Sequence, residues 1–210
     1  AVKHKVLRAI LVHTTGIYSK YKSASEEYKN IESEIRILSD TSLIKVIILR
    51  PTMIFGNIND KNMIVFIKMV DKLRLFPIID SGKNLLQPVN VRDLGKAYYQ
   101  VMIMSPEIKY GDYILSGEKP ITLIDMLKMI SNELQKKTIF VNIPIGMGEF
   151  LAKCLKLCTF GKVDYIEKVR RMGENRSYSH ENAIKDFGYR PMSFTDGIKI
   201  EVNQYVEKYK

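Results

Sequence analysis

Residues 7–56 constrain the fold most, because two short apolar runs flank a stretch with helical periodicity. The first run, Ala9-Ile10-Leu11-Val12, is of the kind buried on both faces of a parallel sheet. The second is Leu43–Leu49, and Arg50-Pro51 ends it because proline has no N–H to donate to a strand ladder. Parallel neighbours need a crossover between them, usually a helix. The segment therefore predicts a βαβ unit and an α/β fold.

The crossover carries its own helix signals. Ser23 and Glu26 have capping-box spacing, so a helix should begin at Ser23. Three-to-four-residue spacing predicts that its buried face is made of Tyr28, Ile31, Ile35 and Leu38. A strand that is buried on both faces of a parallel sheet needs a neighbouring strand on each side. We therefore expect residues 7–13 to form an interior strand, flanked either by strands upstream or by later segments.

The remaining chain alternates between helical and extended patterns. Residues 76–82 are rich in turn formers and are expected to form a turn. Further strands are predicted over 85–91, 113–115 and 138–145. Further helices are predicted over 62–73, 93–104, 122–134, 148–157, 163–172, 179–188 and from 195 or 196 to the end.

The net charge of +10 suggests an anionic partner. The lysines are scattered, whereas a nucleic-acid-binding protein concentrates its charge on one face, so we favour a phosphate-bearing small ligand over nucleic acid. No apolar run approaches the roughly 18 residues that span a bilayer, and the start lacks a signal-peptide core. Cys154 and Cys158 make neither a zinc site nor a disulfide framework. We therefore expect no membrane partner and a cytoplasmic location.

Four segments carry a family resemblance: 11–18 (LVHTTGIY), 48–56 (ILRPTMIFG), 87–94 (QPVNVRDL) and 186–191 (DFGYRP) with 196–198 (DGI). In this order they resemble the extended and atypical short-chain dehydrogenase/reductase superfamily, the NAD-dependent epimerase/dehydratase group. The resemblance covers essentially the whole chain. It implies the C-terminal part of a Rossmann-type parallel sheet over 1–105 and a smaller α/β substrate-binding lobe over 106–210, with the chain passing between them.

The resemblance also implies NAD or NADP as cofactor, a nucleotide sugar as substrate and hydride transfer as chemistry. Open α/β sheets bind ligands at the carboxyl ends of their strands. The catalytic candidates are Thr14, Tyr28 and Tyr18. The cofactor-binding candidates are Thr15, Arg50, Pro51, Thr52 and Ile54. The substrate-binding candidates are Asn57, Gln87, Arg171 and Arg176, the arginines because a guanidinium binds phosphate in a fork. No metal ligands are expected.

The cofactor loop departs from the family pattern. The family's glycine-rich turn follows its first strand, where phosphates approach the backbone and a helix N-terminus, and no such turn precedes Leu7. Gly146-Met147-Gly148 lies between a predicted strand and a helix. However, Leu151 takes the position of the third glycine, and Pro144 interrupts the strand that leads into the segment. We therefore interpret Gly146-Met147-Gly148 as a helix start. The chain resembles the later two-thirds of a longer family member and should bind NAD weakly or not at all.

The catalytic pair departs as well. Family members use Tyr-x-x-x-Lys one helical turn apart, where the ammonium lowers the pKa of the phenol. Glu32 follows Tyr28 at that spacing and would raise it instead, while the literal spacing occurs at Tyr18 and Lys22, ahead of the helix. A third alignment matches Glu32 and Arg36 to a Glu–Arg pair on the helix of atypical family members. In that alignment Ala24 takes the place of the catalytic tyrosine and Tyr28 that of the lysine, so the dyad is absent.

Three functions therefore stay open. The first is an active epimerase/dehydratase-like oxidoreductase, and the second is an inactive relative that binds a dinucleotide or a protein partner. The third is a basic binding module with no cofactor. A homodimer is open for each of them.

Overall fold

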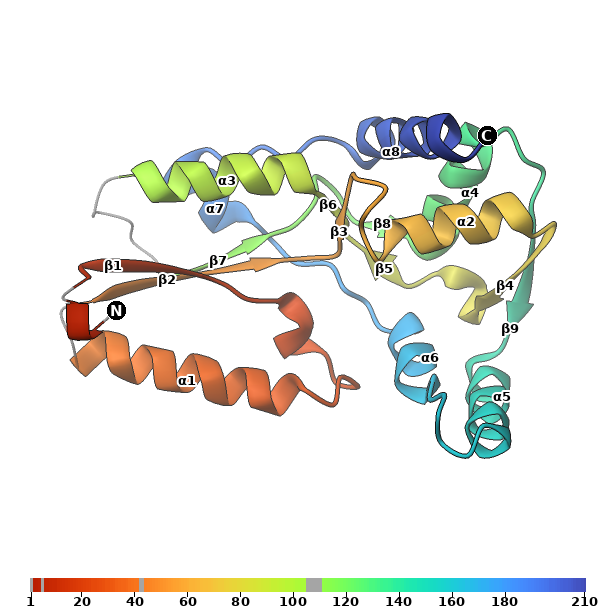
Figure 1. Ribbon diagram of the computed structural model, residues 1–210, viewed down its shortest axis with the longest axis horizontal. Helices are drawn as coiled ribbons and strands as arrows, with labels where there is room; N and C mark the ends of the chain where they lie inside the picture. The colour runs from red at the N-terminus through yellow and green to blue at the C-terminus, as the bar shows by residue number, and fades with distance from the viewer. Residues whose placement is uncertain (1, 5, 42–43, 105–110) are drawn as a thin grey trace.

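The structure is a computed structural model that describes residues 2–4, 6–41, 44–104 and 111–210. One end of the molecule is a three-stranded parallel sheet in the order β1-β2-β7 (Figure 1). Its strands are β1 (Arg8–Val12), β2 (Lys45–Pro51) and β7 (Asp112–Leu115). β1 and β2 pair in parallel from Arg8–Lys45 to Val12–Leu49, which confirms the βαβ unit and the α/β class. Leu43, the predicted start of the second strand, lies outside the described residues.

The expectation that later segments of this chain flank residues 7–13 is wrong for the described residues, whereas flanking by upstream strands stays a prediction. β1 pairs only with β2 there, while β2 has β7 on its other side. Val12 is 48% exposed, whereas Ile47 and Leu49 of β2 are fully buried. Later segments therefore flank β2 but not β1, so the apolar run of β1 lies at an edge.

Helix α1 (Ser25–Thr41) covers one face of this sheet (Figure 1) and begins two residues later than the capping box predicts. The Ser23 hydroxyl donates to Glu167 at 2.8 Å rather than capping the helix. The predicted buried face is also wrong in part, because Ile31 and Leu38 are exposed while Glu32 is 4% exposed. The helix turns Glu32 to the sheet because that carboxylate finds charged partners there.

Three further strand pairs extend the fold. β3 (Ile54–Phe55) pairs in parallel with β6 (Val89–Asn90), and β5 (Leu85–Leu86) pairs antiparallel with β8 (Ile121–Thr122). β4 (Leu75–Ile79) pairs in parallel with β9 (Ile139–Ile143).

The turn predicted over 76–82 is therefore wrong over most of its length. Phe76 and Ile78 alternate inward around an exposed Pro77, and only Asp80–Gly82 form a short 3-10 turn, η3. The inward alternation of Phe76 and Ile78 thus outweighs the turn-forming composition of this segment.

The remaining helices confirm the predicted positions to within a few residues. Gly188 ends α7 in the left-handed conformation (φ 65°), as expected of a C-terminal glycine. Two further 3-10 turns are η1 (Val2–His4) and η2 (Thr15–Tyr18). The helices are α2 (Met63–Lys72), α3 (Val91–Ile103), α4 (Leu123–Glu133), α5 (Ile145–Cys158), α6 (Ile166–Met172), α7 (Glu181–Phe187) and α8 (Phe194–Tyr209). Among the described residues, no helix is long and apolar enough to cross a membrane.

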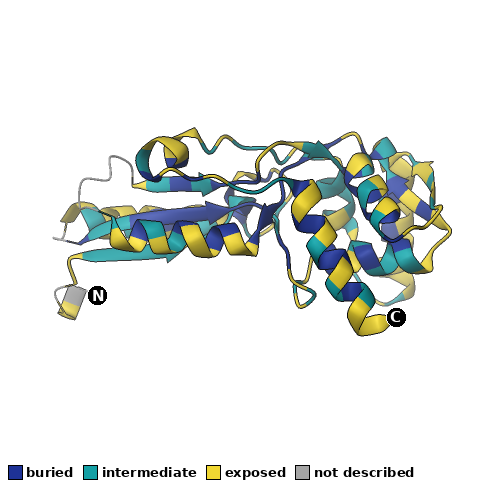
Figure 2. Ribbon diagram, turned by 90° about the horizontal axis from the view of Figure 1, so that it is seen from above, coloured by how far each residue is buried: buried dark blue, intermediate teal, exposed yellow. Residues whose placement is uncertain are grey.

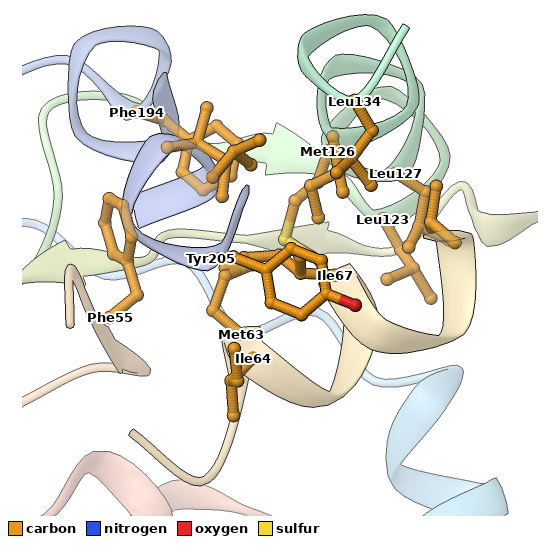
Figure 3. Close-up of a cluster of buried hydrophobic side chains, with 14 of the residues drawn as sticks. Phe55, Met63, Ile64, Ile67, Leu123, Met126, Leu127, Leu134, Phe194 and Tyr205 are labelled. Carbon is orange, nitrogen blue, oxygen red and sulfur yellow. The ribbon is translucent and has the colours of Figure 1, made fainter. Parts of the chain in front are cut away.

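Two hydrophobic clusters hold the molecule together, and both draw on residues before and after position 105. One packs β2 and β7 against α3 and α7. The other packs α2, α4 and α8 around β4 and Phe55 (Figure 3). Figure 2 shows the buried positions running along the sheet and into the helices at the other end. The division at residue 105 stays a prediction.

Candidate functional site

A hollow of about 390 Å³ lies at the carboxyl ends of β1 and β2. Open α/β sheets bind their ligands at this edge. The chain around residues 171–178 closes the opposite side. The lining residues are His13, Thr14, Thr15, Gly16, Ser19, Pro51, Thr52, Met53, Ile54, Asn62, Leu86, Gln87, Arg171, Arg176 and Tyr178. Eight of the twelve sequence-predicted site residues are thus brought together, namely Thr14, Thr15, Pro51, Thr52, Ile54, Gln87, Arg171 and Arg176.

Two hydroxyls follow β1 and have different roles. Thr14 caps η2, where its Oγ1 accepts from the Gly16 N–H at 3.0 Å. Because the cap uses only an oxygen lone pair, the hydroxyl hydrogen of Thr14 stays available to a ligand in the hollow. Thr15 Oγ1 donates to the Pro51 carbonyl at 3.3 Å and so joins the ends of the two strands.

The wall formed by the end of β2 is held by hydrogen bonds. The Thr52 hydroxyl donates to the Gln87 carbonyl at 2.5 Å. The side-chain amide of Gln87 donates to the Gly117 carbonyl at 2.8 Å and accepts from the Tyr178 N–H at 2.9 Å. Gln87 therefore lines the hollow, and its side-chain amide also joins its own segment to those of Gly117 and Tyr178.

Two contacts draw the 171–178 segment across the hollow. Glu174 accepts from the Ser19 hydroxyl and the Lys20 N–H, both at 2.7 Å. The Arg176 N–H donates to the Leu85 carbonyl at 2.7 Å, alongside β5. These contacts place the guanidinium groups of Arg171 and Arg176 at the hollow.

Both of these guanidiniums have an unused donor. The Nε atoms of Arg171 and Arg176 are buried without a hydrogen-bond partner among the described residues. Burial, and then the neighbouring Arg171, lowers the pKa of Arg176. Two adjacent cations with free donors form a site suited to an anion.

Arg50, in β2, is buried and does not line the hollow. Its guanidinium donates to both carboxylate oxygens of Glu32 and to Asp112, and only 2% of it is exposed. His13 Nδ1 lies 2.7 Å from Glu32, and Arg36 lies 3.6 Å from Asp112. Burial acts to raise the pKa of Glu32, but hydrogen bonds from Arg50 and His13 outweigh it and lower that pKa. The network joins α1 to β2, to β7 and to His13, the residue that follows β1.

Neither predicted catalytic tyrosine lines the hollow. Tyr28 is half-buried with its ring edge-on to His13 at 5.2 Å, and Lys22 Nζ lies 5.5 Å from the Tyr28 centroid. Tyr18 is 46% exposed and packs on Tyr178 at 5.5 Å. Burial raises the pKa of Tyr18, although Arg50 opposes the shift. Lys22 thus lies beside Tyr28, and it does not share a helix with Tyr18, because η2 ends at Tyr18 and α1 begins at Ser25.

Two other predicted features lie outside the lining. Asn57 is exposed, and its Oδ1 accepts from the Asn59 N–H at 2.9 Å in a local turn. Gly146-Met147-Gly148 forms the start of α5, as the sequence interpretation expected.

Sequence reasoning missed other lining residues, including His13, Ser19, Asn62 and Tyr178. His13 precedes Thr14 at the strand end, which is the signal that could have identified it. Ser19, Asn62 and Tyr178 follow no motif.

The fold can be compared with known proteins. No family model and no curated protein matches the chain. Among solved structures, UDP-glucose 4-epimerase from Thermotoga maritima, with UDP-glucose, is similar over 100% of this chain and 66% of its own, at 14% identity and a TM-score of 0.73. The chain has the fold of the NAD-dependent epimerases and dehydratases.

Two further structures share this epimerase/dehydratase fold. UDP-glucuronic acid 4-epimerase from Bacillus cereus, in complex with UDP-glucuronic acid and NAD, matches 96% of this chain and 62% of its own (14% identity, TM-score 0.69). A dTDP-glucose 4,6-dehydratase double mutant from Streptomyces venezuelae, with NAD bound, matches 98% and 62% (18% identity, TM-score 0.69). The chain thus spans about two thirds of the length of these three epimerase/dehydratase structures.

Proposed function

We propose that this chain belongs to an NAD(P)-dependent epimerase/dehydratase-like oxidoreductase that acts on a nucleotide sugar. The observation that carries the proposal is the hollow at the strand ends. It combines the strand-end hydroxyls of Thr14 and Thr15 with the guanidiniums of Arg171 and Arg176 in a chain with the epimerase/dehydratase fold. We retain a cytoplasmic location in the proposal, consistent with the two free cysteines.

The arginines support a diphosphate-bearing substrate. Each has a buried Nε donor without a partner among the described residues, and a phosphate oxygen satisfies such a donor. Glu167, the acidic partner of Arg171, lies 3.7 Å away, beyond hydrogen-bond distance. In this proposal Arg171 and Arg176 hold the nucleotide diphosphate.

In this proposal the ends of β1 and β2 hold the nicotinamide cofactor. Pro51, Thr52 and Ile54 form one wall, with the Thr52 hydroxyl already engaged by the Gln87 carbonyl. Thr14 retains a hydroxyl hydrogen that is free to donate to the oxygen of the reacting carbon. A bound nicotinamide would accept a hydride from the substrate and return it.

The competing proposal is an inactive relative that binds a dinucleotide or a protein partner. A catalytic phenol needs a lowered pKa, whereas burial raises that of Tyr18. Tyr28 packs against His13 outside the lining. These positions of the two tyrosines favour the competitor.

Calorimetric titration of this chain with UDP-glucose tests the substrate half of the proposal. We expect binding that Arg171→Ala and Arg176→Ala each weaken by at least about tenfold, since a charged hydrogen bond contributes about 1.5–3 kcal/mol. Arg170→Ala is the matched control, because Arg170 pairs with Glu149 and does not line the hollow. Equal weakening by all three variants would reject the assigned site.

Hydride exchange separates the active enzyme from the inactive relative. With NAD and UDP-sugars supplied to the whole protein, a change in reduced-nicotinamide absorbance that Thr14→Val abolishes supports the enzyme. Binding of both ligands with no such change supports the inactive relative. If neither NAD nor a UDP-sugar binds, the result supports the third function, a basic binding module without a cofactor.

A further inference from the structure

Helix α5 presents its largest apolar side chains to the outside. Six residues at helical spacing form a continuous stripe on one face, and every one of them is exposed. We name this set the α5 stripe. It consists of Met147, Phe150, Leu151, Cys154, Leu157 and Cys158.

The inner face of α5 carries only small buried residues, Gly148 and Ala152. A Cβ added at Gly148 would lie 2.8 Å from the Ile79 side chain, so the helix backbone packs directly against the end of β4. An amphipathic helix of a soluble domain normally turns its bulky apolar face inward. In α5 this polarity is inverted, and Figure 1 shows the helix at the periphery, beyond β9.

The turn after α5 continues the apolar surface. Phe160 is 93% exposed and Leu157 is 79% exposed. Both line a shallow hollow of about 610 Å³, together with Gly161, Ile166 and two lysines, Lys153 and Lys156. Its surface is therefore apolar with ammonium groups beside it, which suits an acyl chain with an anionic head group.

The charge around the stripe is positive. Lys153, Lys156 and Lys162 flank it and are exposed, and Lys156 lies 2.7 Å from Asp164. The acid within the helix, Glu149, is bonded to Arg170 at 3.1 Å. Lys153 and Lys162 have no salt bridge among the described residues, so their charge is available to a partner.

We propose that the α5 stripe lies in the head-group region of an anionic phospholipid bilayer, with Phe150, Leu157 and Phe160 inserted and the lysines on lipid phosphates. Interfacial helices bury an apolar face beside basic residues in this way and need no spanning segment. A second copy of the chain fits the stripe less well. Pairing would place lysines against lysines on two molecules that each carry a net charge of +10.

Vesicle sedimentation of the chain tests the proposal. We expect binding to phosphatidylcholine–phosphatidylglycerol vesicles and little to phosphatidylcholine alone. Lys153→Gln and Lys162→Gln should each weaken binding about fivefold, since a basic residue near an anionic surface contributes about 1 kcal/mol. The Phe150→Ser/Leu157→Ser variant should lose at least about tenfold.

The matched control is Met102→Ser/Ile103→Ser, two residues of α3 that are 59% and 60% exposed. It should bind as the unchanged chain does. Far-UV circular dichroism confirms that each variant is folded. Equal loss in the α3 and α5 variants would overturn the proposal.

A tryptophan probe gives a second readout, because the chain has no tryptophan. Phe160→Trp should show a blue-shifted emission with anionic vesicles and quenching by brominated lipid. Tyr99→Trp, at a 58% exposed position on α3, should show neither. Absence of a shift at position 160 would overturn the proposal. So would a dimer in sedimentation velocity that Phe150→Ser dissociates without any vesicle binding.

Discussion

Arg50 is the largest almost completely buried side chain in the part of the molecule that the structure describes, and its charge is balanced by Glu32 and Asp112. Burial acts to lower the pKa of Arg50, but the hydrogen bonds that Arg50 donates to the two carboxylates outweigh it and raise that pKa. Removing one partner of such a pair leaves an uncompensated buried charge, which costs far more than the pair contributes.

Arg50→Met should therefore lower the free energy of unfolding by about 3–5 kcal/mol, because Glu32 keeps its burial and loses its main partner. Urea denaturation measures the change. Arg36→Met is the matched control, since Arg36 is half-exposed and 3.6 Å from Asp112, and it should change stability by less than about 1 kcal/mol. A similar small effect for both variants would contradict a buried network.

Glu201 is fully buried on α8, where it accepts from the Gly56 N–H at 2.6 Å. Burial, and then the Asp60 carboxyl, raises the pKa of Glu201 to about 9. Between the unfolded pKa, about 4.3, and this value, the folded state keeps a proton that the unfolded state has lost. Glu201 therefore makes the protein less stable as pH rises through this window.

Glu201→Gln should remove this dependence, because the amide stays neutral and retains an acceptor for Gly56. The stability difference between variant and unchanged chain should grow with pH by up to about 1.4 kcal/mol per unit from about pH 5 to 9. Urea denaturation across that range measures it. Glu207→Gln, at an exposed position on the same helix, should leave the pH profile unchanged. Parallel profiles for Glu201→Gln and the unchanged chain would refute the assignment.

At the scale of elements, replacing glycine by alanine should have opposite effects on stability at two helical positions. A Cβ at Gly197 of α8 would lie 2.7 Å from Phe55 Cζ, whereas one at Gly95 of α3 meets nothing within 4 Å. Gly197→Ala should cost about 1–3 kcal/mol by overpacking, and Gly95→Ala should gain about 0.5–1 kcal/mol from helix propensity. Chemical denaturation of both variants measures the signs, and stabilisation by both would contradict the packing of α8 on Phe55.

Elements with strong local signals could be predicted from sequence, and those decided by distant partners could not. Thr122 and Asn90 accept from helix N–H groups at the starts of α4 and α3, close to where the patterns predicted helices. α1 turned a different face inward because the partners of Glu32 are His13, directly after β1, and Arg50 of β2. In β4, Pro77 and the nearby turn formers concealed a strand that pairing with β9 stabilises.

The candidate site shows the same division. Strand-end residues such as Thr14 and Thr52 were predictable, since parallel strands bring their carboxyl ends together. Tyr178 and Asn62 were not, because contacts far apart in sequence, such as Glu174 with Ser19, position the segments that carry them. The direction of the α5 stripe was likewise hidden, since periodicity alone does not say which face is buried.

For the molecule as a whole, the shared fold and partial length bear on cofactor affinity. The chain spans 62–66% of three similar solved structures, two of which contain NAD. Among the described residues, the two glycines at the start of α5, Gly146 and Gly148, do not line the hollow. We therefore expect calorimetry to find weak or no binding of NAD to this chain, and a dissociation constant of about 1 μM, or −8 kcal/mol, would contradict this.

Strand β1 gives the molecule one more property. Among the described residues its outer side is unpaired, and its one charged residue, Arg8, donates to carbonyls at the end of α3 and so does not guard that side. A row of free backbone groups beside Ile10 and Leu11 is a template on which another extended chain can add by main-chain pairing. A peptide paired with β1 at this edge would lengthen the sheet by one strand.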